Sequence, residues 1–162
     1  MPKLYIARTP DGSDLPLPSY ASRFHTGLTL SAAIGAPMKI SSHERINIPI
    51  GFAIGIPQGF CGQILGFPDI VRDHGIVVSG SPLLLNPADR EPLFIPIQNI
   101  SSNPYVLHRG EIIAQLLILP ATLGYWQEIA VNAKGQVTDE STLVVEEGTS
   151  DAPPGRSPSS TS

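Results

Sequence analysis

Alternating large apolar residues between positions 46 and 56 constrain the fold more than any other feature of the chain. They are Ile46, Ile48, Ile50, Phe52, Ile54 and Ile56. In an extended strand, alternate side chains point to the same side, whereas a helix would distribute them around its axis. The segment therefore predicts a strand with one buried face. Pro49 cannot donate a hydrogen bond to a sheet, so it predicts an edge strand or a bulge within this segment.

Proline and glycine favour the same fold class along the rest of the chain. The 162 residues include 17 Pro and 15 Gly, spread between short apolar runs so that turn signals recur every several residues. The best helix candidate is Pro68–His74, because a proline begins it, Asp69 lies in its first turn and Gly75 follows its end. We expect an all-β fold, a β-barrel or jelly-roll sandwich of many short strands with at most one or two short helices.

The domain organisation follows from length and from a change of composition near the C-terminus. A chain of 162 residues is long enough for one domain and a tail. Residues 146–162 consist of Ser, Thr, Pro, Gly, acids, Ala and one Arg, a composition that cannot bury a core. We therefore predict a β domain over residues 1–145 and a disordered C-terminal tail over residues 146–162.

Charge and composition exclude several function classes. The formal net charge is −4, which argues against binding to nucleic acid. No apolar run approaches the length of a membrane span, and the N-terminus lacks a signal-peptide pattern, so we expect an intracellular protein without a membrane partner. The single cysteine, Cys61, excludes an internal disulfide. The four histidines are scattered without metal-ligand spacing, so we expect no metal site.

From Gly27 to about Leu119, the chain resembles the dUTPase family, all-β enzymes that cleave dUTP to dUMP and pyrophosphate. Residues 54–63 read Ile-Gly-Ile-Pro-Gln-Gly-Phe-Cys-Gly-Gln, which is similar to the family hairpin Ile-x-Ile-Pro-x-Gly-x-x-Gly-Arg. Segments 26–32, 74–77, 93–99 and 109–116 resemble further family segments in the same order. The resemblance implies a dUTPase-like fold and a homotrimer whose sites are built from more than one chain.

Several positions that carry function in the family hold other residue types here. Thr29 occupies the place of the first motif's aspartate. Phe67, Pro68 and Asp69 occupy the places of the Arg-Ser-Gly that binds phosphates in the second motif. Phe67 carries no positive charge, Pro68 lacks a backbone N–H, and Asp69 would repel a triphosphate. The resemblance therefore predicts the loss of a phosphate-binding segment.

The third and fourth motifs complete the set of candidate residues. Asn86 stands where the family carries the carboxylate base, and an amide cannot accept a proton at neutral pH. Asp89 replaces the family's tyrosine, and its displacement by three residues disfavours it as a substitute base. Gln115 is retained from the fourth motif, where the family places it near the phosphates, and a structural amide at a strand end is the favoured interpretation. The family's C-terminal Gly-Phe-Gly-Ser lid is missing.

We therefore expect a non-catalytic dUTPase-fold protein that acts as a protein-binding or regulatory module. It would resemble the degenerate dUTPase relatives of adenoviruses, with a host or viral protein partner and a location in the host cytoplasm or nucleus. No catalytic residue, metal or cofactor is expected. The following residues would form a degenerate former nucleotide site: Thr29, Phe67, Pro68, Asp69, Asn86, Asp89 and Gln115.

Two alternatives remain open at this point. One is a dUTP diphosphatase-type hydrolase with an altered active site, which would use Mg²⁺ and the acids nearest the changed motifs, Asp69, Asp73 and Asp89. The other is a structural or virion component that uses the trimer as a building block.

Overall fold

The alternating apolar segment forms strand β4 (Arg45–Gly55), which crosses the centre of the structure. The computed structural model describes residues 1–129 and 131–137. Five of the six alternating apolar side chains are buried, and Ile46 is partly buried against them. The pairing of β4 with β8 shifts register between Pro49 and Ala53. This shift is the predicted bulge, and β1 pairs with β4 only beyond it, from Phe52 to Gly55.

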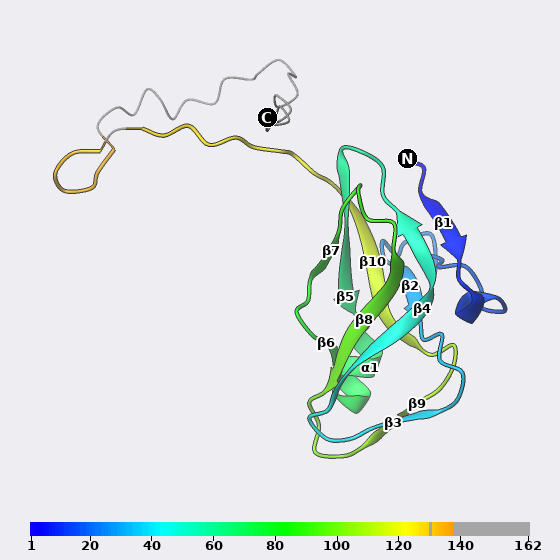
Figure 1. Ribbon diagram of the computed structural model, residues 1–162. Helices are drawn as coiled ribbons and strands as arrows, with labels where there is room; N and C mark the ends of the chain where they lie inside the picture. The colour runs from blue at the N-terminus through cyan, green and yellow to red at the C-terminus, as the bar shows by residue number, and fades with distance from the viewer. Residues whose placement is uncertain (130, 138–162) are drawn as a thin grey trace, which may run out of the picture. The chain divides into compact units, whose positions relative to one another are not determined.

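The strands form two four-stranded antiparallel sheets and one small two-stranded sheet (Figure 1). Their bounds are β1 (Tyr5–Arg8), β2 (Leu28–Ser31), β3 (Met38–Ile40), β5 (Phe60–Gly66), β6 (Ile76–Val78), β7 (Leu83–Leu85), β8 (Pro92–Asn99), β9 (Tyr105–Leu107) and β10 (Ile112–Pro120). One sheet has the order β1-β4-β8-β6 and the other β2-β10-β5-β7, while β3 pairs with β9. Long connections between successive neighbours in each sheet are typical of jelly-roll sandwiches.

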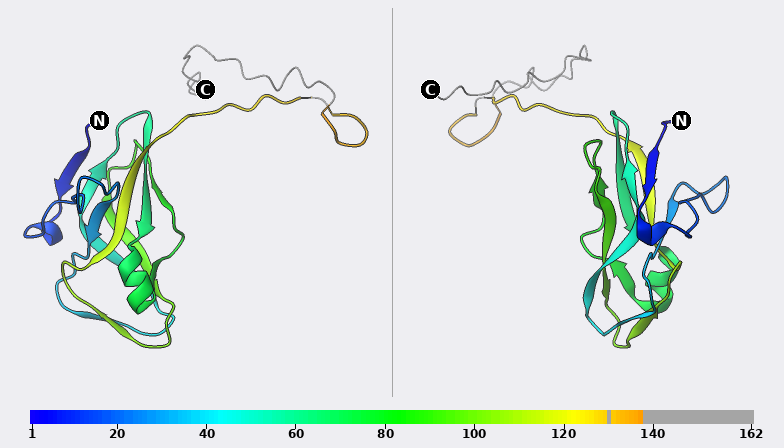
Figure 2. Two further views of the ribbon diagram at one scale, coloured as in Figure 1. Left: turned by 180° about the vertical axis from the view of Figure 1, so that it is seen from behind. Right: turned by 45° about the vertical axis from the view of Figure 1, so that its right-hand side comes forward.

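A single hydrophobic core lies between the two larger sheets (Figure 2). Ile48 and Ile97 from the first sheet and Ile64 and Leu116 from the second are almost completely buried in it. The expected all-β fold is confirmed. Helix α1 (Pro68–His74) has the predicted bounds, and Gly75 ends it in the left-handed conformation with φ of 68°. A short 3₁₀ helix covers Pro10–Gly12.

The chain divides into two units, Met1–Leu123 and Gly124–Ser162. The first holds both large sheets. In the described part of the second, Val131 and Val137 form an isolated bridge. The predicted tail at 146–162 lies outside the described residues, and the boundary at residue 145 remains a prediction. No helix within residues 1–129 and 131–137 has the length and apolar character that a membrane span requires.

The N-terminal segment packs onto β4 through two glycines. A Cβ atom added to Gly12 would lie 2.0 Å from the carbonyl oxygen of Gly51, and one added to Gly51 would lie 2.5 Å from the Cα of Gly12. The Thr9 amide donates a 3.0 Å hydrogen bond to the Gly51 carbonyl oxygen. Because backbone meets backbone here, no side-chain movement can relieve an added methyl group.

We predict that Gly51→Ala destabilises the fold by several kcal/mol more than Gly59→Ala. Both glycines have positive φ, +81° and +79°, but nothing lies within 4 Å of a Cβ added at Gly59. Gly59→Ala should therefore cost only the backbone strain, about 1–2 kcal/mol. Gly51→Ala adds the clash with Gly12, which places it among the rare substitutions that cost about 4 kcal/mol or more. Urea unfolding measures both, and equal costs would contradict the close contact.

Candidate functional site

The predicted site residues lie in three places on the chain. Thr29 and Gln115 are on neighbouring strands of the second sheet, at the same register position. Phe67, Pro68 and Asp69 form the start of α1. Asn86 and Asp89 lie in the segment that follows β7. Since β5 lies between β10 and β7, a single chain does not gather all of these residues into one cluster.

The segment after β7 brings Asp89 back to Asn86. The Asp89 Oδ2 atom accepts a 2.7 Å hydrogen bond from the backbone N–H of Asn86 and lies 3.4 Å from its side-chain amide nitrogen. The backbone N–H of Asp89 donates in return to the Asn86 carbonyl oxygen at 3.1 Å. A carboxylate therefore lies directly against the position where the family carries its base. Residues 86–89, Asn-Pro-Ala-Asp, are typical of a turn. This turn is the sequence signal that could have placed Asp89 beside Asn86.

Arg90 stabilises the same turn through hydrogen bonds to its backbone. Its Nη1 atom donates to the carbonyl oxygens of Pro87 and Asp89, at 2.5 and 2.6 Å. These bonds hold the turn in one conformation and use donors of the guanidinium that a ligand would otherwise accept from.

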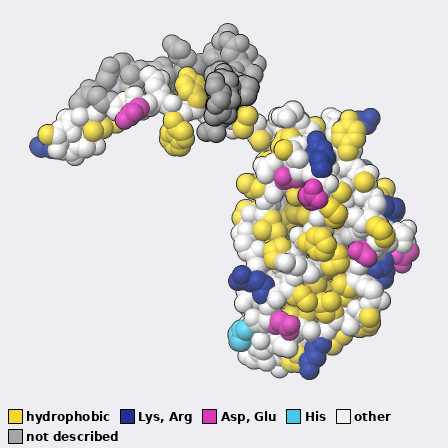
Figure 3. Space-filling view, in the orientation of Figure 1, with side chains coloured by type: hydrophobic (Ala, Val, Ile, Leu, Met, Phe, Trp, Pro, Cys, Tyr) yellow, Lys and Arg dark blue, Asp and Glu magenta, His cyan; other side chains and the backbone are white. Residues whose placement is uncertain are grey.

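A cavity of about 360 Å³ lies beside this turn, within the size range of small-molecule sites. The residues that line it are Ile64, Leu83, Leu84, Leu85, Asp89, Glu91, Pro92, Leu93 and Phe94. Its walls are thus apolar apart from two carboxylates, and sequence reasoning had not identified Glu91. Figure 3 shows hydrophobic side chains gathered over the middle of this face of the molecule. Leu84 and Phe94 are 57% and 52% exposed.

Thr29 and Gln115 form the second group. The Thr29 hydroxyl donates to the Ser19 carbonyl oxygen at 3.1 Å, and the Thr29 amide donates to the same oxygen at 2.9 Å. Gln115 packs against Gly27 so closely that an added Cβ there would lie 2.4 Å from the Gln115 Oε1 atom. The glycine therefore leaves room for the carboxamide at the base of the segment that precedes β2.

The start of α1, the third group, is acidic. Phe67 occupies the N-cap position without a side-chain cap, and Pro68 provides no N–H in the first turn. Arg72 pairs with Asp69 at 3.2 Å and with Asp73 at 2.7 Å, and the hydrogen bond from Arg72 lowers the pKa of the Asp73 carboxyl. The helix's arginine is therefore engaged by its own carboxylates, and this helix start is poorly suited to hold phosphate groups.

The acids of the described residues do not form a complete metal site. Within residues 1–129 and 131–137, no three His, Cys, Asp or Glu side chains lie together as a set that could hold a metal ion. Asp89 and Glu91 nevertheless line one cavity. Mg²⁺ typically binds through one or two protein carboxylates together with phosphate oxygens of a substrate. The residues present fit that kind of site.

Comparison with known proteins identifies relatives for most of the chain. The chain is 37% identical over 126 residues to the deoxyuridine 5'-triphosphate nucleotidohydrolase of Wolbachia sp. subsp. Brugia malayi (strain TRS), covering 78% of this chain and 81% of that protein. It is 39% identical over 117 residues to the protein of the same name from Aquifex aeolicus (strain VF5), covering 72% of this chain and 78% of that protein. No protein-family profile matches the chain.

Solved structures support the fold. The dUTPase from phage phi11 of S. aureus superposes with a TM-score of 0.70 at 14% identity, covering 81% of this chain and 98% of that one. The dUTPase from Streptococcus mutans gives a TM-score of 0.63 at 19% identity, covering 75% and 98%. A variant of the phi11 enzyme coordinates a structural Mg(II) ion.

These relatives correct the expected function. The expectation of a non-catalytic module is wrong, because relatives at 37% and 39% identity are nucleotidohydrolases. The expectation that no cofactor takes part is corrected likewise, by the Mg(II) ion of the phi11 enzyme. An adenovirus-like regulator and a host protein partner find no support among these relatives. The sequence disfavoured Asp89 as a substitute base because it lies three residues from Asn86, but the turn brings its carboxylate to the Asn86 backbone.

We predict that Gly27→Ala displaces the Gln115 side chain without unfolding the protein. The added methyl group would lie 2.4 Å from the movable Gln115 Oε1 atom and 3.1 Å from the Gln115 Cβ, which cannot turn away, so the free energy of unfolding should fall by about 1–2 kcal/mol while the fold is kept. Gly35→Ala is the matched control, since nothing lies within 4 Å of a Cβ added there. The NMR resonances of the Gln115 side-chain amide should move in Gly27→Ala only. Unmoved resonances would contradict the packing of Gln115 on Gly27.

Proposed function

Since the chain belongs to the dUTPase family, we propose that it hydrolyses dUTP to dUMP and pyrophosphate through an altered active site. The observation that carries the proposal is the hydrogen bond between the Asp89 carboxylate and the backbone of Asn86. It supports a site in which the base is retained in space although its sequence position has changed. The altered positions remain Thr29, Phe67, Pro68, Asp69 and Asn86, and they distinguish this site from that of a family member with complete motifs.

In this proposal Asp89 is the general base. The carboxylate takes a proton from a water molecule while the water oxygen forms a bond to phosphorus. The phosphoanhydride bond between the α- and β-phosphates breaks, and its electron pair leaves with pyrophosphate. Asn86 contributes in a different way, because its backbone and side-chain N–H groups hold the Asp89 Oδ2 atom in place. The other carboxylate oxygen, Oδ1, remains for the water.

The apolar cavity beside Asp89 would receive the uncharged part of the nucleotide. Leu83, Leu85 and Leu93 provide apolar walls for it. Glu91, the second carboxylate of the cavity, would hold Mg²⁺ together with phosphate oxygens. When bound, the cation neutralises the charge that develops on the leaving pyrophosphate. This assignment replaces the expectation of a chain without cofactors.

A homotrimer, which the family resemblance implies, would explain the separation of the site residues. Thr29 and Gln115 lie on β2 and β10, while Asp89 follows β7 on the other side of β5. Contact between two copies would bring the turn of one chain to the strands of another. Exposed Leu84 and Phe94 beside the cavity support such an association, because burial of these side chains is favourable.

We predict that the full-length protein releases pyrophosphate from dUTP in the presence of Mg²⁺, and that Asp89→Asn lowers kcat by about 10²–10⁴-fold with little change in KM. The asparagine keeps an oxygen that can accept the hydrogen bond from Asn86, so the turn should persist. Removal of Mg²⁺ with a chelator should abolish turnover, and its return should restore it.

Asp73, one of the three acids first considered for an altered site, does not line the cavity and pairs with Arg72, so Asp73→Asn is the matched control for this measurement. It removes an exposed carboxylate that pairs with Arg72 on α1, away from the cavity, and kcat should stay within about twofold of the wild-type value. A wild-type protein that releases no pyrophosphate would overturn the proposed activity. Equal kcat values for wild type and Asp89→Asn would overturn the role of Asp89 alone.

We predict that sedimentation equilibrium gives a mass about three times the 17.2 kDa of one chain. The trimer should persist at the protein concentration of the activity assay, because the site requires more than one chain. A mass of one chain at a concentration where dUTP is hydrolysed would show that a single chain suffices and would contradict the trimer.

A further inference from the structure

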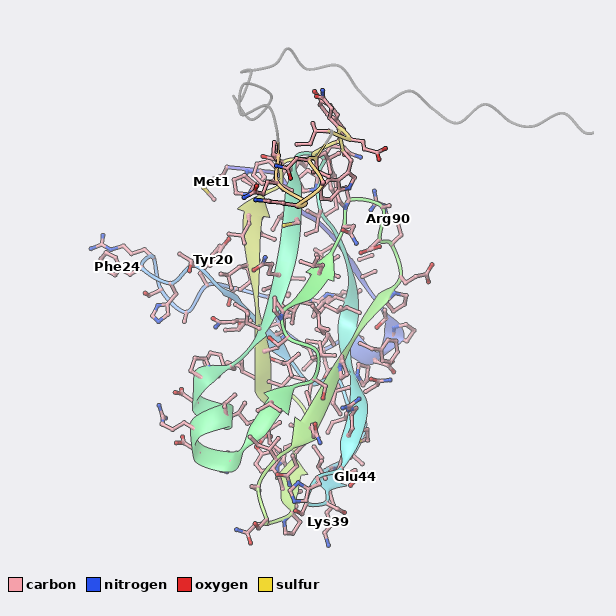
Figure 4. The ribbon with its side chains drawn as sticks, turned by 90° about the vertical axis from the view of Figure 1, so that its left-hand side faces the viewer. Met1, Tyr20, Phe24, Lys39, Glu44 and Arg90 are labelled. Carbon is pink, nitrogen blue, oxygen red and sulfur yellow. The ribbon has the colours of Figure 1, made fainter. Side chains whose placement is uncertain are left out.

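The segment between the N-terminal region and β2 forms a projecting loop, residues 19–26, which carries Phe24 away from the two sheets and has Tyr20 near its base (Figure 4). Phe24 is 80% exposed and Tyr20 is 44% exposed. The loop is anchored at its base, where Tyr20 bridges to Leu28 and Ser19 accepts both hydrogen bonds from Thr29. It therefore rises directly from the group formed by Thr29 and Gln115.

Arg23 gives this loop an available cation. Its guanidinium lies over the Phe24 ring, 4.7 Å from the ring centre. Stacking uses the flat face of the guanidinium and leaves its N–H groups, which point outward in the plane, free to donate. The ring also restricts the side chain, so less conformational freedom is lost when a ligand binds. Arg23 is thus arranged to bind an anion.

The other arginines of the described chain are largely engaged. Arg8 and Arg90 donate to backbone carbonyl oxygens, while Arg72 and Arg109 pair with aspartates. Within residues 1–129 and 131–137, only Arg23 and Arg45 have no hydrogen-bond or ion-pair partner, and Arg45 begins β4 in the other sheet.

Local charge favours the same ligand. The 19–26 loop carries one cation, Arg23, and neither Asp nor Glu, although the whole chain is acidic. Helix α1, in contrast, holds Asp69 in its first turn and Asp73 near its end, and the two acids share one cation, Arg72. A ligand with several negative charges is therefore attracted to the 19–26 loop and repelled by the helix.

Resting on the proposed function, we infer that the 19–26 loop binds the polyphosphate group of the nucleotide through Arg23. This arginine supplies the positive charge that Phe67 and Pro68 do not provide. The guanidinium of Arg23 donates to phosphate oxygens. Thr29 and Gln115, which pair with each other across β2 and β10, lie at the base of the loop. The ligand class is a nucleoside triphosphate or its pyrophosphate product.

Equilibrium binding to the full-length protein tests this inference with three probes: dUpNHpp, pyrophosphate and deoxyuridine. The first is a dUTP analogue, present in a structure of the phage 80alpha enzyme. Arg23→Ala should weaken binding of dUpNHpp and pyrophosphate by roughly 10- to 100-fold, the usual range for a charged hydrogen-bond donor. Arg23→Lys keeps the charge without the fork and should weaken them less. Deoxyuridine, which has no phosphate, should bind as it does to the wild type.

Arg45→Ala is the matched control, since it removes the same side chain from the other sheet and should leave all three affinities unchanged. Wild-type affinities in Arg23→Ala would overturn the inference even if the protein hydrolyses dUTP. An equal loss of deoxyuridine binding would also overturn it, because the arginine would then only support the loop. Arg23-dependent binding without hydrolysis would support the inference and contradict the proposed activity. A wild type that binds no phosphate probe would overturn both.

Discussion

The antiparallel pairing of β4 with β8 is the constraint on which the rest of the structure depends. It aligns Ile48 with Ile95 and Ile46 with Ile97, and the buried members of these pairs form much of the first sheet's contribution to the core. The bulge after Pro49 lets Gly51 approach Gly12, which fixes the N-terminal segment across the strand. Because β8 begins directly after the turn that holds Asp89, the same pairing also fixes one end of that turn.

Charge neutralisation limits the chemistry that such a scaffold can perform. A triphosphate needs cations, yet several arginines here stabilise the protein's own loops: Arg109 donates to the carbonyl oxygens of Ile34 and Asp11 and pairs with Asp14. The guanidinium holds the pKa of the Asp14 carboxyl below its ordinary value, which is the expected sign for a carboxylate beside a cation. An arginine engaged in this way cannot also bind substrate without loosening the N-terminal segment. In the proposed function, cations for the phosphates would come from arginines with free donors or from Mg²⁺.

Local signals predicted the elements that local interactions determine. Helix α1 has its predicted bounds because Pro68 and Gly75 act within one turn of its ends. The alternating isoleucines likewise predicted β4, because apolar residues at every second position lie on one face of a strand but not of a helix. The contact between Gly12 and Gly51 could not be predicted, since it joins segments that only the folded chain brings together. The sequence also did not reveal which strands are neighbours, and so did not show that Asp89 lies apart from Thr29 and Gln115.

The relatives overturn the expected loss of activity, and the proposed role of Asp89 would give this correction a physical reason. A motif assigns a role to a sequence position, but chemistry depends on where an atom lies. A turn that begins with Asn-Pro returns the chain on itself within three residues, so the Asp89 carboxylate reaches the Asn86 backbone. In the proposed site, the carboxylate would then come from Asp89 at the other end of the same turn. The amide can then hold the carboxylate that replaces it.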